Sequence, residues 1–534
     1  MRSMTSRIVI SGIGVASPFG VGRERFWDHV SRGCSGTRAI ADFDASEFAC
    51  RVAAPVPSVT IDDIPAIDGD DIWDPDYRAD PKRYSRAALI GVIAAREAWT
   101  DAGLAIGEPN AGVIVGSGGG GIDVGERQYY DFFVERGKKV TPYAIPVSIV
   151  GMVSSEISIS LRLRGVSHVL SCGCTSSTDA MGYAAALLRS GETEVVISGG
   201  TDACVTPGMI FGFSRMHAVS TAYNDRPGEA SRPFDKGRDG FVLGEGAWMV
   251  VLEREDRARA RGATIYASID GYGSTCDAYH RVQMAPDGEE IVRAMALAIE
   301  RSGRHRDEIG YVSYHGTSTL MNDAVESRCV HQVFGDRAER LAGSSVKSMI
   351  GHPQGASGAA GVVTAALALS RGYLPPTINQ RDPDPACDLD VIPNTRIIVL
   401  SKHSEEFRVR AALELGIRGY VLKTRTADEL LRSIQEVSHG RTYFSPEIAH
   451  VVADLVLEPF TNRGPVRRAS QLTDRERQVV TLIAEGNSTK EVAARLGISV
   501  KTADCHRTRI MDKLNVHQTA NLVRYAIREG YIEA

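Results

Sequence analysis

The feature that most constrains the fold is a cysteine at the junction of a short apolar run and an alanine-rich stretch. Cys174 follows Val169 and Leu170, and a run of helical composition begins at about Ser176. A residue on such a sharp strand-to-helix turn is held with its side chain out of the backbone, as in a nucleophile elbow. The positive end of the following helix favours the thiolate, the form that a nucleophilic cysteine needs. The pattern predicts a strand–turn–helix unit that presents a reactive thiol.

Two histidines further along the chain share one kind of setting. His315 stands in Tyr-His-Gly-Thr-Ser-Thr, and His352 stands in Ile-Gly-His-Pro-Gln-Gly. Each follows an apolar segment and is surrounded by small or turn-forming residues, so we expect each on a loop at the end of a strand. Singly, either is equally well explained as a structural histidine. Together with Cys174, they indicate a Cys-His-His site.

Strand-like and helix-like runs alternate through most of the chain, which favours α/β layering. The expected strands of the first half are residues 7–10, 112–115, 195–198 and 248–252, and the expected helices are 85–99 and 178–188. The second half repeats the alternation. Its expected strands are residues 265–269 and 311–314, and its expected helices are 290–300 and 355–369.

Over roughly the first 394 residues, these motifs resemble the beta-ketoacyl-ACP synthases of the thiolase superfamily. Besides the cysteine and histidine motifs, the resemblance rests on the blocks at residues 7–14, 232–235 and 240–247. Gly-Cys-Thr-Ser followed by Asp179 and Gly182 is similar to the ketosynthase alpha subunit of type II polyketide synthases, with the fatty-acid synthase II type close behind. The resemblance implies a fold of duplicated thiolase-like αβαβα layers.

The resemblance also implies a role for each candidate residue. Cys174 accepts an acyl chain from a thioester, which forms a covalent intermediate. His315 and His352 hydrogen-bond the oxygen of a malonyl thioester as it loses CO2. Lys347 orients and electrostatically tunes the site. Phe213 forms a wall of the acyl pocket, although an aromatic residue in an apolar stretch is more often simply part of a core.

Composition fits a large soluble enzyme. Hydrophobic residues make up 43% and charged residues 24%, and the net charge of -5 predicts no general affinity for nucleic acid or anionic membranes. The nine cysteines show no paired spacing and are expected as reduced thiols in the cytoplasm. We find no signal sequence and no apolar run of membrane-spanning length. We therefore expect a cytoplasmic protein without a membrane partner.

Cofactors and partners follow from the resemblance rather than from composition. We expect no bound cofactor and no metal. Acyl and malonyl groups are implied to arrive on the phosphopantetheine arm of an acyl carrier protein. The resemblance further implies a dimer, either a homodimer or a heterodimer with a chain-length-factor-like subunit.

The C-terminal part carries three helix signals in a row. Capping-box patterns open the first two helices at Thr473 and Ser488, and Gly497 ends the second. Ser499 caps a third helix that runs to about Leu514. Three helices in this arrangement indicate a helix-turn-helix that binds double-stranded DNA, with a small protein-binding module as the alternative.

The third helix has one apolar and one polar face. Ala503, Ile510 and Leu514 share the apolar face. Residues 465–534 carry 12 Lys and Arg against 8 Asp and Glu, a local net charge of +4 that suits contact with phosphates. The candidate DNA-binding residues are Lys501, Thr502, Asp504, Cys505, Thr508 and Arg509.

About the last 65 residues resemble the LuxR/NarL-family DNA-binding domain. The motifs are Leu-Thr-Asp-Arg-Glu-Arg at 472–477, Gly-Asn-Ser-Thr-Lys-Glu-Val-Ala at 486–493 and Ile-Ser-Val-Lys-Thr at 498–502. The sequence departs from that family in Ala503 and Cys505, where Val and Thr are common. Both changes are mild, so the expectation of DNA binding stands.

The stretch between these parts resembles the last β-α-β-α of a response-regulator receiver. Ser401, Tyr420 and Lys423 match its switch hydroxyl, switch aromatic and invariant lysine. The front half of a receiver, with its acidic cluster and phospho-accepting aspartate, has no counterpart in the sequence. We therefore predict no phosphotransfer in this part.

The junction after residue 394 interrupts the ketosynthase pattern. Family members continue there into an Asn-rich strand and a Gly-Phe-Gly-Gly loop, which supplies one backbone N–H of the oxyanion hole. Loss of such a donor typically costs a factor of about 100 to 1000 in rate. The apolar run at residues 396–401 is hypothesised to replace the missing strand. We expect ketosynthase halves at 1–264 and 265–394, a receiver remnant at 395–440, a linker at 441–470 and a LuxR-type domain at 471–534.

Three interpretations of the whole chain remain open. The first is a beta-ketoacyl-ACP synthase for fatty acid or polyketide biosynthesis with a DNA-binding tail, impaired by the missing loop. The second is a transcriptional regulator whose ketosynthase body is a non-catalytic dimerisation or acyl-sensing scaffold. The third is a chance fusion in which neither role is tuned. The presence of all the catalytic side chains favours the first.

Overall fold

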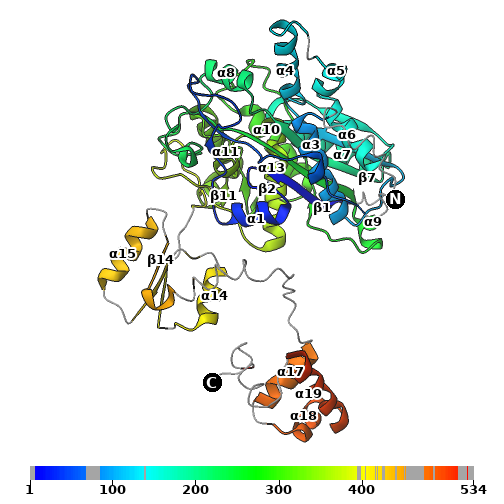
Figure 1. Ribbon diagram of the computed structural model, residues 1–534, viewed down its shortest axis with the longest axis vertical. Coiled ribbons are helices and arrows are strands. Elements are labelled where there is room, and N and C mark those ends of the chain that lie inside the picture. The colour runs from blue at the N-terminus through cyan, green and yellow to red at the C-terminus, as the bar shows by residue number, and fades with distance from the viewer. Residues whose placement is uncertain are drawn as a thin grey trace. The chain divides into compact units, whose positions relative to one another are not determined.

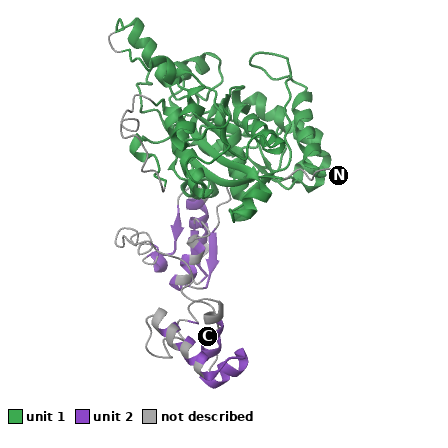
Figure 2. Ribbon diagram, turned by 90° about the vertical axis from the view of Figure 1, so that its right-hand side faces the viewer, with its two compact units in different colours: residues 1–395 green, residues 396–534 purple. Residues whose placement is uncertain are grey.

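The computed structural model of the chain describes residues 7–67, 84–137 and 140–393, interrupted stretches between 398 and 452, residues 474–484 and 487–514, and residue 526. The chain divides into two compact units, residues 1–395 and 396–534 (Figures 1 and 2). The first unit holds the cysteine and both histidines. The second holds the segments expected to resemble a receiver and a DNA-binding domain.

A mixed nine-stranded sheet lies at the centre of the first unit. Its main strands run in the order β2-β1-β8-β7-β5-β6, with β4 beside β8, β3 beside β4, and β9 beside β1. β5 is parallel to β6 and β7, whereas β8 is antiparallel to both β7 and β1. The bounds are β1 Ile8–Ser17, β2 Gly20–Val21, β3 Arg38–Ala39, β4 Val52–Ala54, β5 Ala111–Gly116, β6 Ser167–Leu170, β7 Val195–Ala203, β8 Leu243–Arg254 and β9 Ala267–Ile269.

Helices cover both faces of this sheet because its strands are apolar on both sides. Alternate residues of β5 and β7 pack against α3 and α6 on one face and against α7 and α13 on the other. Gly14 allows α3 to approach β1 closely, since a Cβ there would lie 1.9 Å from the Ala94 carbonyl oxygen. The helices of the first half are α1 Arg23–Ser31, α3 Arg86–Asp101, α4 Ile122–Phe133, α5 Ala144–Ser148, α6 Met152–Leu161, α7 Ser176–Ser190, α8 Pro207–Arg215 and α9 Glu255–Ala260.

The second half of this unit repeats part of the first. β10 and β11 form a parallel pair, and α13 follows β11 after the short helix α12 and a turn, whereas α7 follows β6 after a single turn. α7 and α13 pack against each other in one apolar cluster. The bounds are α10 Glu289–Ser302, β10 Val312–Ser313, α11 Leu320–Phe334, β11 Gly343–Ser344, α12 Lys347–Ile350 and α13 Ser357–Arg371.

An arm formed by α4 and α5 projects from the body of the first unit (Figure 1). It carries many of the large apolar side chains that this unit exposes to solvent. They are Tyr129, Tyr130, Phe132, Phe133, Val134, Val140, Ile145 and Ile149. Such a concentration of exposed apolar residues is typical of a protein interface.

The second unit begins with a parallel β-α-β-α-β arrangement, β12-β13-β14, in which β13 is central. The hypothesis that residues 396–401 complete the ketosynthase sheet is wrong, because β12 pairs with β13 in this separate sheet. β14 lies within residues 441–470, where a linker was expected. The bounds are β12 Ile398–Ser401, α14 Glu406–Glu414, β13 Gly419–Leu422, α15 Ala427–Ser438 and β14 Tyr443–Phe444.

Three helices lie in the described residues of the C-terminal part, as the capping patterns predict. They are α17 Asp474–Ala484, α18 Thr489–Leu496 and α19 Val500–Leu514. Ser488 and Glu491 form the expected capping box of α18, and Gly497 ends that helix in the left-handed conformation. The expected cap at Thr473 lies outside the described residues. A small apolar core joins the three helices and includes Ala503 and Ile510 of α19.

The structure bears on two further features of the chain, membrane-spanning helices and cysteines. Among the described residues, no helix is both long enough and apolar enough to span a bilayer. The eight described cysteines are free, with no disulfide among them. Cys174 is half-buried, and the neighbouring Cys172 is exposed.

Candidate active site

Cys174 lies where the sequence predicts it, on the turn between β6 and α7. The turn is a single 3-10 turn, Gly173–Thr175, that runs directly into α7. Gly173 has a φ of 76°, a conformation that glycine adopts without strain. The Ser176 hydroxyl accepts the N–H of Cys172 at 3.0 Å and donates to the Gly173 carbonyl at 2.6 Å. These bonds fix the turn and hold the sulfur in place.

His352 contacts the sulfur directly. Its Nε2 lies 3.1 Å from the Sγ of Cys174, and its Nδ1 hydrogen-bonds the Ser357 hydroxyl at 2.8 Å. The backbone around His352 is tied to β8 through its N–H, which donates to the Val242 carbonyl, and its carbonyl, which accepts from Gly244. The ring is therefore held at both of its nitrogens, and the loop that carries it is anchored to the central sheet.

His315 completes the triad from the loop after β10. Its ring lies edge-on to that of His352, with the centroids 5.4 Å apart. Donor atoms of Cys174, His315 and His352 all lie within 4.8 Å of one another. The predicted Cys-His-His convergence is therefore present, although the two histidines lie 141 and 178 residues after Cys174 in the sequence.

Glu326 is a half-buried residue of α11 that the sequence analysis missed. Its carboxylate accepts the backbone N–H groups of His315 at 2.6 Å and Gly316 at 2.7 Å. It also lies close enough to Lys347 to interact electrostatically with it. The only sequence signal for Glu326 is its position. It lies within one to two turns of the start of α11, just after the His315 motif.

The electrostatics of the site favour uncharged histidines. Burial, assisted by the charge of Lys347, lowers the pKa of His315 and of His352 well below the usual value. Burial lowers the pKa of Lys347 to about 8, although Glu326 and Cys174 oppose that shift. Lys347 is therefore mainly charged at neutral pH, and both imidazoles are neutral.

The expectation that the helix end makes Cys174 a thiolate needs correction. Burial raises the pKa of the Cys174 thiol, and this outweighs the opposing effects of Lys347 and of the residue's own backbone N–H. The resting pair is therefore a thiol beside a neutral imidazole. Because the Nε2 of His352 is within hydrogen-bonding distance, it can accept the proton as the sulfur attacks.

A metal ion fits this donor set poorly. Cysteine and two histidines are common zinc ligands, but they bind zinc at about 2.0 to 2.3 Å as a thiolate and neutral imidazoles. Here the ammonium of Lys347, buried in the same site, disfavours a second cation. The direct contact between sulfur and imidazole instead suits proton transfer.

A cavity of 370 Å³ opens on the sulfur. Cys174, His315, Lys347 and Glu326 line one side of it, together with Thr178 of α7. The other side is the face of α13 that carries Gly358, Gly361, Val362 and Ala365. A thioester in this cavity can therefore reach the sulfur of Cys174 and the ring of His315.

Phe213 is connected to the histidine site by aromatic packing through Phe241, a residue that the sequence analysis did not single out. Phe213 of α8 is half-buried and packs edge-on against Phe241, with ring centroids 5.2 Å apart. Phe241 in turn packs edge-on against His352 at 5.3 Å. Phe213 thus lies one aromatic ring away from the imidazole of His352.

Asp202 at the end of β7 organises the loops around the triad and was also missed. Its carboxylate accepts the N–H groups of Gly118 and Gly119 at 2.8 Å and of Gly355 at 2.6 Å, and the Ser117 hydroxyl at 2.8 Å. One buried carboxylate therefore joins the loop after β5 to the loop between His352 and α13.

The candidate DNA-binding residues lie on α19. Thr502 and Asp504 are exposed on the side opposite to the buried Ala503 and Ile510, as predicted. The side chains of Lys501, Cys505, Thr508 and Arg509 lie outside the described part of the structure. The hydroxyl of Ser499 accepts the N–H of Thr502 at 3.1 Å, which is the expected N-terminal cap.

Comparisons with known families agree with these two sites. Residues 5–258 match the beta-ketoacyl synthase N-terminal domain, and residues 266–381 match its C-terminal domain. Residues 470–526 match the luxR family of bacterial regulatory proteins. The chain belongs to the beta-ketoacyl synthase family, whose members are acyltransferases, and it carries a fused luxR-type DNA-binding domain.

More particular similarities point to synthases that act in fatty acid and polyketide biosynthesis. The 3-oxoacyl-[acyl-carrier-protein] synthase 2 of Coxiella burnetii is 40% identical over 394 residues, covering 73% of this chain and 92% of that protein. The tetracenomycin polyketide synthase ketoacyl synthase alpha subunit of Streptomyces glaucescens is 37% identical over 431 residues, covering 78% and 95%. The resemblances to the beta-ketoacyl-ACP synthases and to the LuxR/NarL-family domain are confirmed, whereas the resemblance to a receiver stays a prediction.

Solved structures give the same picture for the fold. The ishigamide ketosynthase/chain length factor matches with a TM-score of 0.65 and 35% identity, covering 73% of this chain and 92% of that one. A beta-ketoacyl synthase from Burkholderia phymatum matches with a TM-score of 0.65 and 32% identity, covering 73% and 92%. The predicted thiolase-like ketosynthase fold is confirmed.

Proposed function

We propose that this chain catalyses the decarboxylative condensation of an acyl thioester with a malonyl thioester at the Cys174 site. The single observation that carries the proposal is the convergence of the Cys174 sulfur with two neutral histidines and a buried lysine. In the first stage, the Cys174 sulfur attacks the acyl thioester carbonyl as its proton passes to His352 Nε2, which lies 3.1 Å away. The carrier thiol leaves with a proton, and the acyl chain stays on the sulfur.

The second stage uses both histidines as hydrogen-bond donors. The malonyl group loses CO2, and the electron pair of the broken carbon–carbon bond moves into an enolate. Once the carrier thiol has left, His352 takes the tautomer with its proton on Nε2, while Nδ1 accepts from the Ser357 hydroxyl, so this imidazole and that of His315 can each donate to the enolate oxygen. The enolate carbon then attacks the carbonyl of the acyl-Cys174 thioester, forms the new carbon–carbon bond and releases the thiolate.

Lys347 and Phe213 are given supporting roles. The charge of Lys347 lowers the pKa of the thiol and of both imidazoles, which keeps the histidines neutral while it favours departure of the sulfur as thiolate. Phe213 packs against Phe241, which packs against His352, and we assign these two rings to the wall of the path that an acyl chain takes beside His352.

The substrates are proposed to arrive on an acyl carrier protein. The names of the relatives support this, since the Coxiella burnetii protein is a 3-oxoacyl-[acyl-carrier-protein] synthase. One similar solved structure, with a TM-score of 0.65 and 28% identity, is a type II polyketide acyl-carrier protein in complex with its ketosynthase. We propose that the reaction takes place in the cytoplasm.

We further propose that the first unit works as a dimer, with itself or with a chain-length-factor-like chain. Two features support an interface. The α4–α5 arm exposes a row of aromatic and aliphatic side chains, and β6 is an edge strand of the central sheet whose Ser167 and His168 are exposed. A ketosynthase/chain length factor pair is among the similar structures.

The luxR-type domain gives the chain a second proposed activity, binding to double-stranded DNA through α19. The short βαβαβ unit before it supports the proposal of a receiver remnant. In that unit the N–H of Lys423 donates to the Ser401 carbonyl at 2.7 Å, and Tyr420 is buried. We expect no label on an aspartate of this chain after incubation with acetyl phosphate, and labelling of one would overturn that expectation.

The alternative of a non-catalytic regulator is tested by two assays on the full chain. We expect release of CO2 from malonyl-ACP and acyl transfer from acyl-ACP, with transfer lost in Cys174→Ala. The exposed Cys172→Ala variant is the matched control and keeps both activities. A chain that binds acyl-ACP and DNA but performs neither reaction would support the regulator instead.

A further inference from the structure

The turn that presents the nucleophile carries two thiols, and each thiol contacts its own proton acceptor. Cys172 and Cys174 are separated by a single residue, Gly173. The Sγ of Cys174 lies 3.1 Å from the Nε2 of His352. The Sγ of Cys172 lies 3.1 Å from a carboxylate oxygen of Asp179, in the first turn of α7. The proposed condensation uses the first of these contacts and leaves the second without a role.

The Asp179 carboxylate is ionised and receives hydrogen bonds from two segments of the chain. It accepts from the Thr175 hydroxyl at 2.8 Å, within the turn, and from the phenol of Tyr272, which follows β9. Burial opposes the shift, but the hydrogen bonds from Tyr272, Cys172 and Thr175 lower the pKa of Asp179. An ionised carboxylate in contact with the Cys172 thiol can accept its proton.

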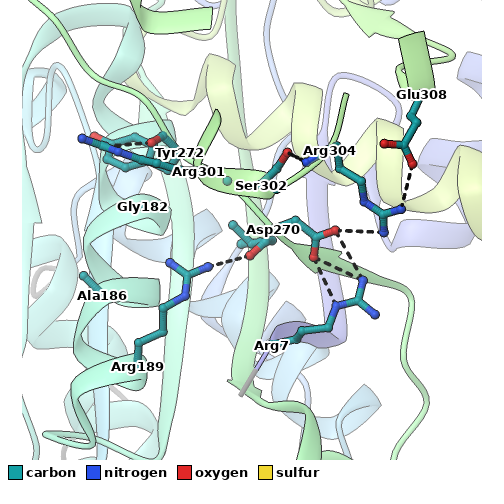
Figure 3. A pocket seen from close by; sticks show the side chains of 13 residues that line it. Arg7, Gly182, Ala186, Arg189, Asp270, Tyr272, Arg301, Ser302, Arg304 and Glu308 are labelled. Carbon is teal, nitrogen blue, oxygen red and sulfur yellow. Dashed lines mark hydrogen bonds and ion pairs between the residues drawn. The ribbon is translucent and has the colours of Figure 1, made fainter. Parts of the chain in front are cut away.

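Tyr272 is fixed in turn, which keeps the carboxylate beside Cys172. Its ring packs so closely against α7 that a Cβ at Gly182 would lie 2.6 Å from it (Figure 3). Its backbone carbonyl accepts from Arg301 at 2.9 Å (Figure 3). The contact between Cys172 and Asp179 is therefore part of a network that joins the nucleophile turn to the segment after β9.

The backbone of the turn allows the two sulfurs to meet. Cα atoms two residues apart in a chain are separated by at most about 7 Å, and by less in a turn. A disulfide joins Cα atoms that are about 4.4 to 6.8 Å apart. Cys172 is exposed, so its side chain has room to turn from Asp179 toward Cys174. Thr175 marks how near it already is, because its hydroxyl lies 3.7 Å from the Cys172 sulfur and it lines the same cavity as Cys174.

Cys174 is the thiol of this pair that reacts first with an oxidant. The 370 Å³ cavity that opens on its sulfur is large enough for a thioester, and hydrogen peroxide is much smaller. Burial raises the pKa of both thiols. The charge of Lys347 opposes this effect at Cys174, whereas the hydrogen bond to Asp179 adds to it at Cys172. Cys172 therefore stays protonated beside a thiol that is easier to ionise.

We propose that Cys172 and Cys174 form a peroxide-reactive dithiol site, in which Cys172 is the resolving thiol for an oxidised Cys174. The Cys174 sulfur attacks one oxygen of hydrogen peroxide as its proton passes to His352. The O–O bond breaks, the released hydroxide takes the proton from His352 and leaves as water, and Cys174 becomes a sulfenic acid.

The second step closes the disulfide. The sulfur of Cys172 attacks the sulfenic sulfur of Cys174 as its proton passes to Asp179. The S–O bond breaks, and the released hydroxide takes the proton from Asp179 and leaves as water. In sum, two thiols and one peroxide give one disulfide and two waters, so hydrogen peroxide is the only oxidant required.

The disulfide protects the nucleophile while it is out of use. A bridge across a single residue is strained, and strained disulfides are labile to dithiols, which return Cys174 as a thiol. Without Cys172, the sulfenic acid of Cys174 can be oxidised further to sulfinic acid, which dithiols do not reduce. Formation of the disulfide is independent of the condensation, whereas its effect as an off state rests on the proposed function.

The site is tested by peptide mass spectrometry on the full chain without substrate. Reduced protein is treated with a small molar excess of hydrogen peroxide, blocked with N-ethylmaleimide and digested with trypsin without reductant. The tryptic peptide 165–189 contains Cys172 and Cys174 and no other cysteine. We expect it to be lighter by two hydrogen atoms and to carry no maleimide. Dithiothreitol added before blocking should restore both maleimide adducts.

Cys172→Ala removes the resolving thiol. After peroxide and then dithiothreitol, the fraction of Cys174 recovered as thiol should be about tenfold lower in this variant than in the wild type, with sulfinic acid in its place. Cys276→Ala, at an exposed cysteine outside the turn, is the matched control and should behave as the wild type. Thermal unfolding of each variant confirms that it is folded.

Three results in folded wild-type protein would overturn the proposal. The first is that both thiols of the peptide remain free for blocking after peroxide. The second is sulfinic acid at Cys174 beside a free Cys172. The third is a disulfide from Cys172 or Cys174 to any other cysteine. Since no acyl-ACP or malonyl-ACP is present, each of these results is distinct from failure of the condensation assay.

Discussion

The Sγ of Cys174 and the Nε2 of His352 lie 3.1 Å apart, and the other ring nitrogen of His352 is held by Ser357. Burial raises the pKa of the thiol and lowers that of the imidazole. Both groups are therefore neutral at rest, and a proton moves between them only as the sulfur attacks. This relationship makes the pair a nucleophile and its base rather than a preformed ion pair.

Replacing each histidine separates the two stages of the reaction. His352→Ala removes the base beside the sulfur and one enolate donor, so both acyl transfer and malonyl-ACP decarboxylation should fall, each by a factor of about 100 to 1000. His315→Ala removes a donor that is not bonded to the sulfur, so decarboxylation should fall by a similar factor while acyl transfer falls less. Equal loss of both steps in the two variants would contradict the assignment.

Lys347 controls the pH at which Cys174 becomes reactive. Its charge lowers the pKa of the thiol, so Lys347→Met should move the pH profile of iodoacetamide alkylation at Cys174 to higher pH. In the wild type, the lysine itself loses its charge near pH 8, so the assistance weakens as the pH rises through that value. Lys236→Met, at an exposed lysine, is the control and should leave the profile unchanged. A shift to lower pH in Lys347→Met is the contrary result.

Glu326 is expected to act as a positioning residue. Glu326→Gln keeps the size of the side chain but removes its negative charge. That charge holds the His315 loop and raises the pKa of Lys347. We expect kcat to fall about tenfold or more while KM changes little, with a lower apparent pKa for Lys347 in the pH profile. Glu300→Gln, at an exposed position on α10, is the control. A change in KM alone would indicate a role in binding instead.

Much of this site follows from local sequence pattern. The Cys174 turn and the two histidine loops are marked by small residues next to apolar runs, and the helix caps at Ser488 and Ser499 are equally local. Glu326, Asp202 and Phe241 were missed because their roles depend on contacts between segments far apart in the chain or on which face of a helix is buried.

Two expectations were wrong for related physical reasons. An apolar run such as residues 396–401 predicts a strand but carries no information about which sheet it joins, and its partner is β13. The N-terminus of α7 favours a thiolate at Cys174, but burial of the thiol outweighs this effect, and that burial arises from the tertiary fold. Local pattern therefore predicts element type and turn chemistry, whereas pairing and desolvation require the fold.

The C-terminal domain is expected to bind DNA through the polar face of α19. A Lys501→Ala/Arg509→Ala double variant should weaken binding of the full chain to a pool of bacterial promoter fragments and reduce the salt dependence by about two counterions. The condensation activity of this variant should be unchanged. Unaltered affinity and salt slope would show that this face does not contact phosphates.

The account rests most directly on acylation of one sulfur, which intact-protein and peptide mass spectrometry can measure after incubation with acyl-ACP. We predict one acyl adduct for each chain, located on Cys174, absent in Cys174→Ala and retained in Cys172→Ala. An adduct on the exposed Cys172 instead, or none in a folded wild-type chain, would contradict the assignment of Cys174 as the nucleophile.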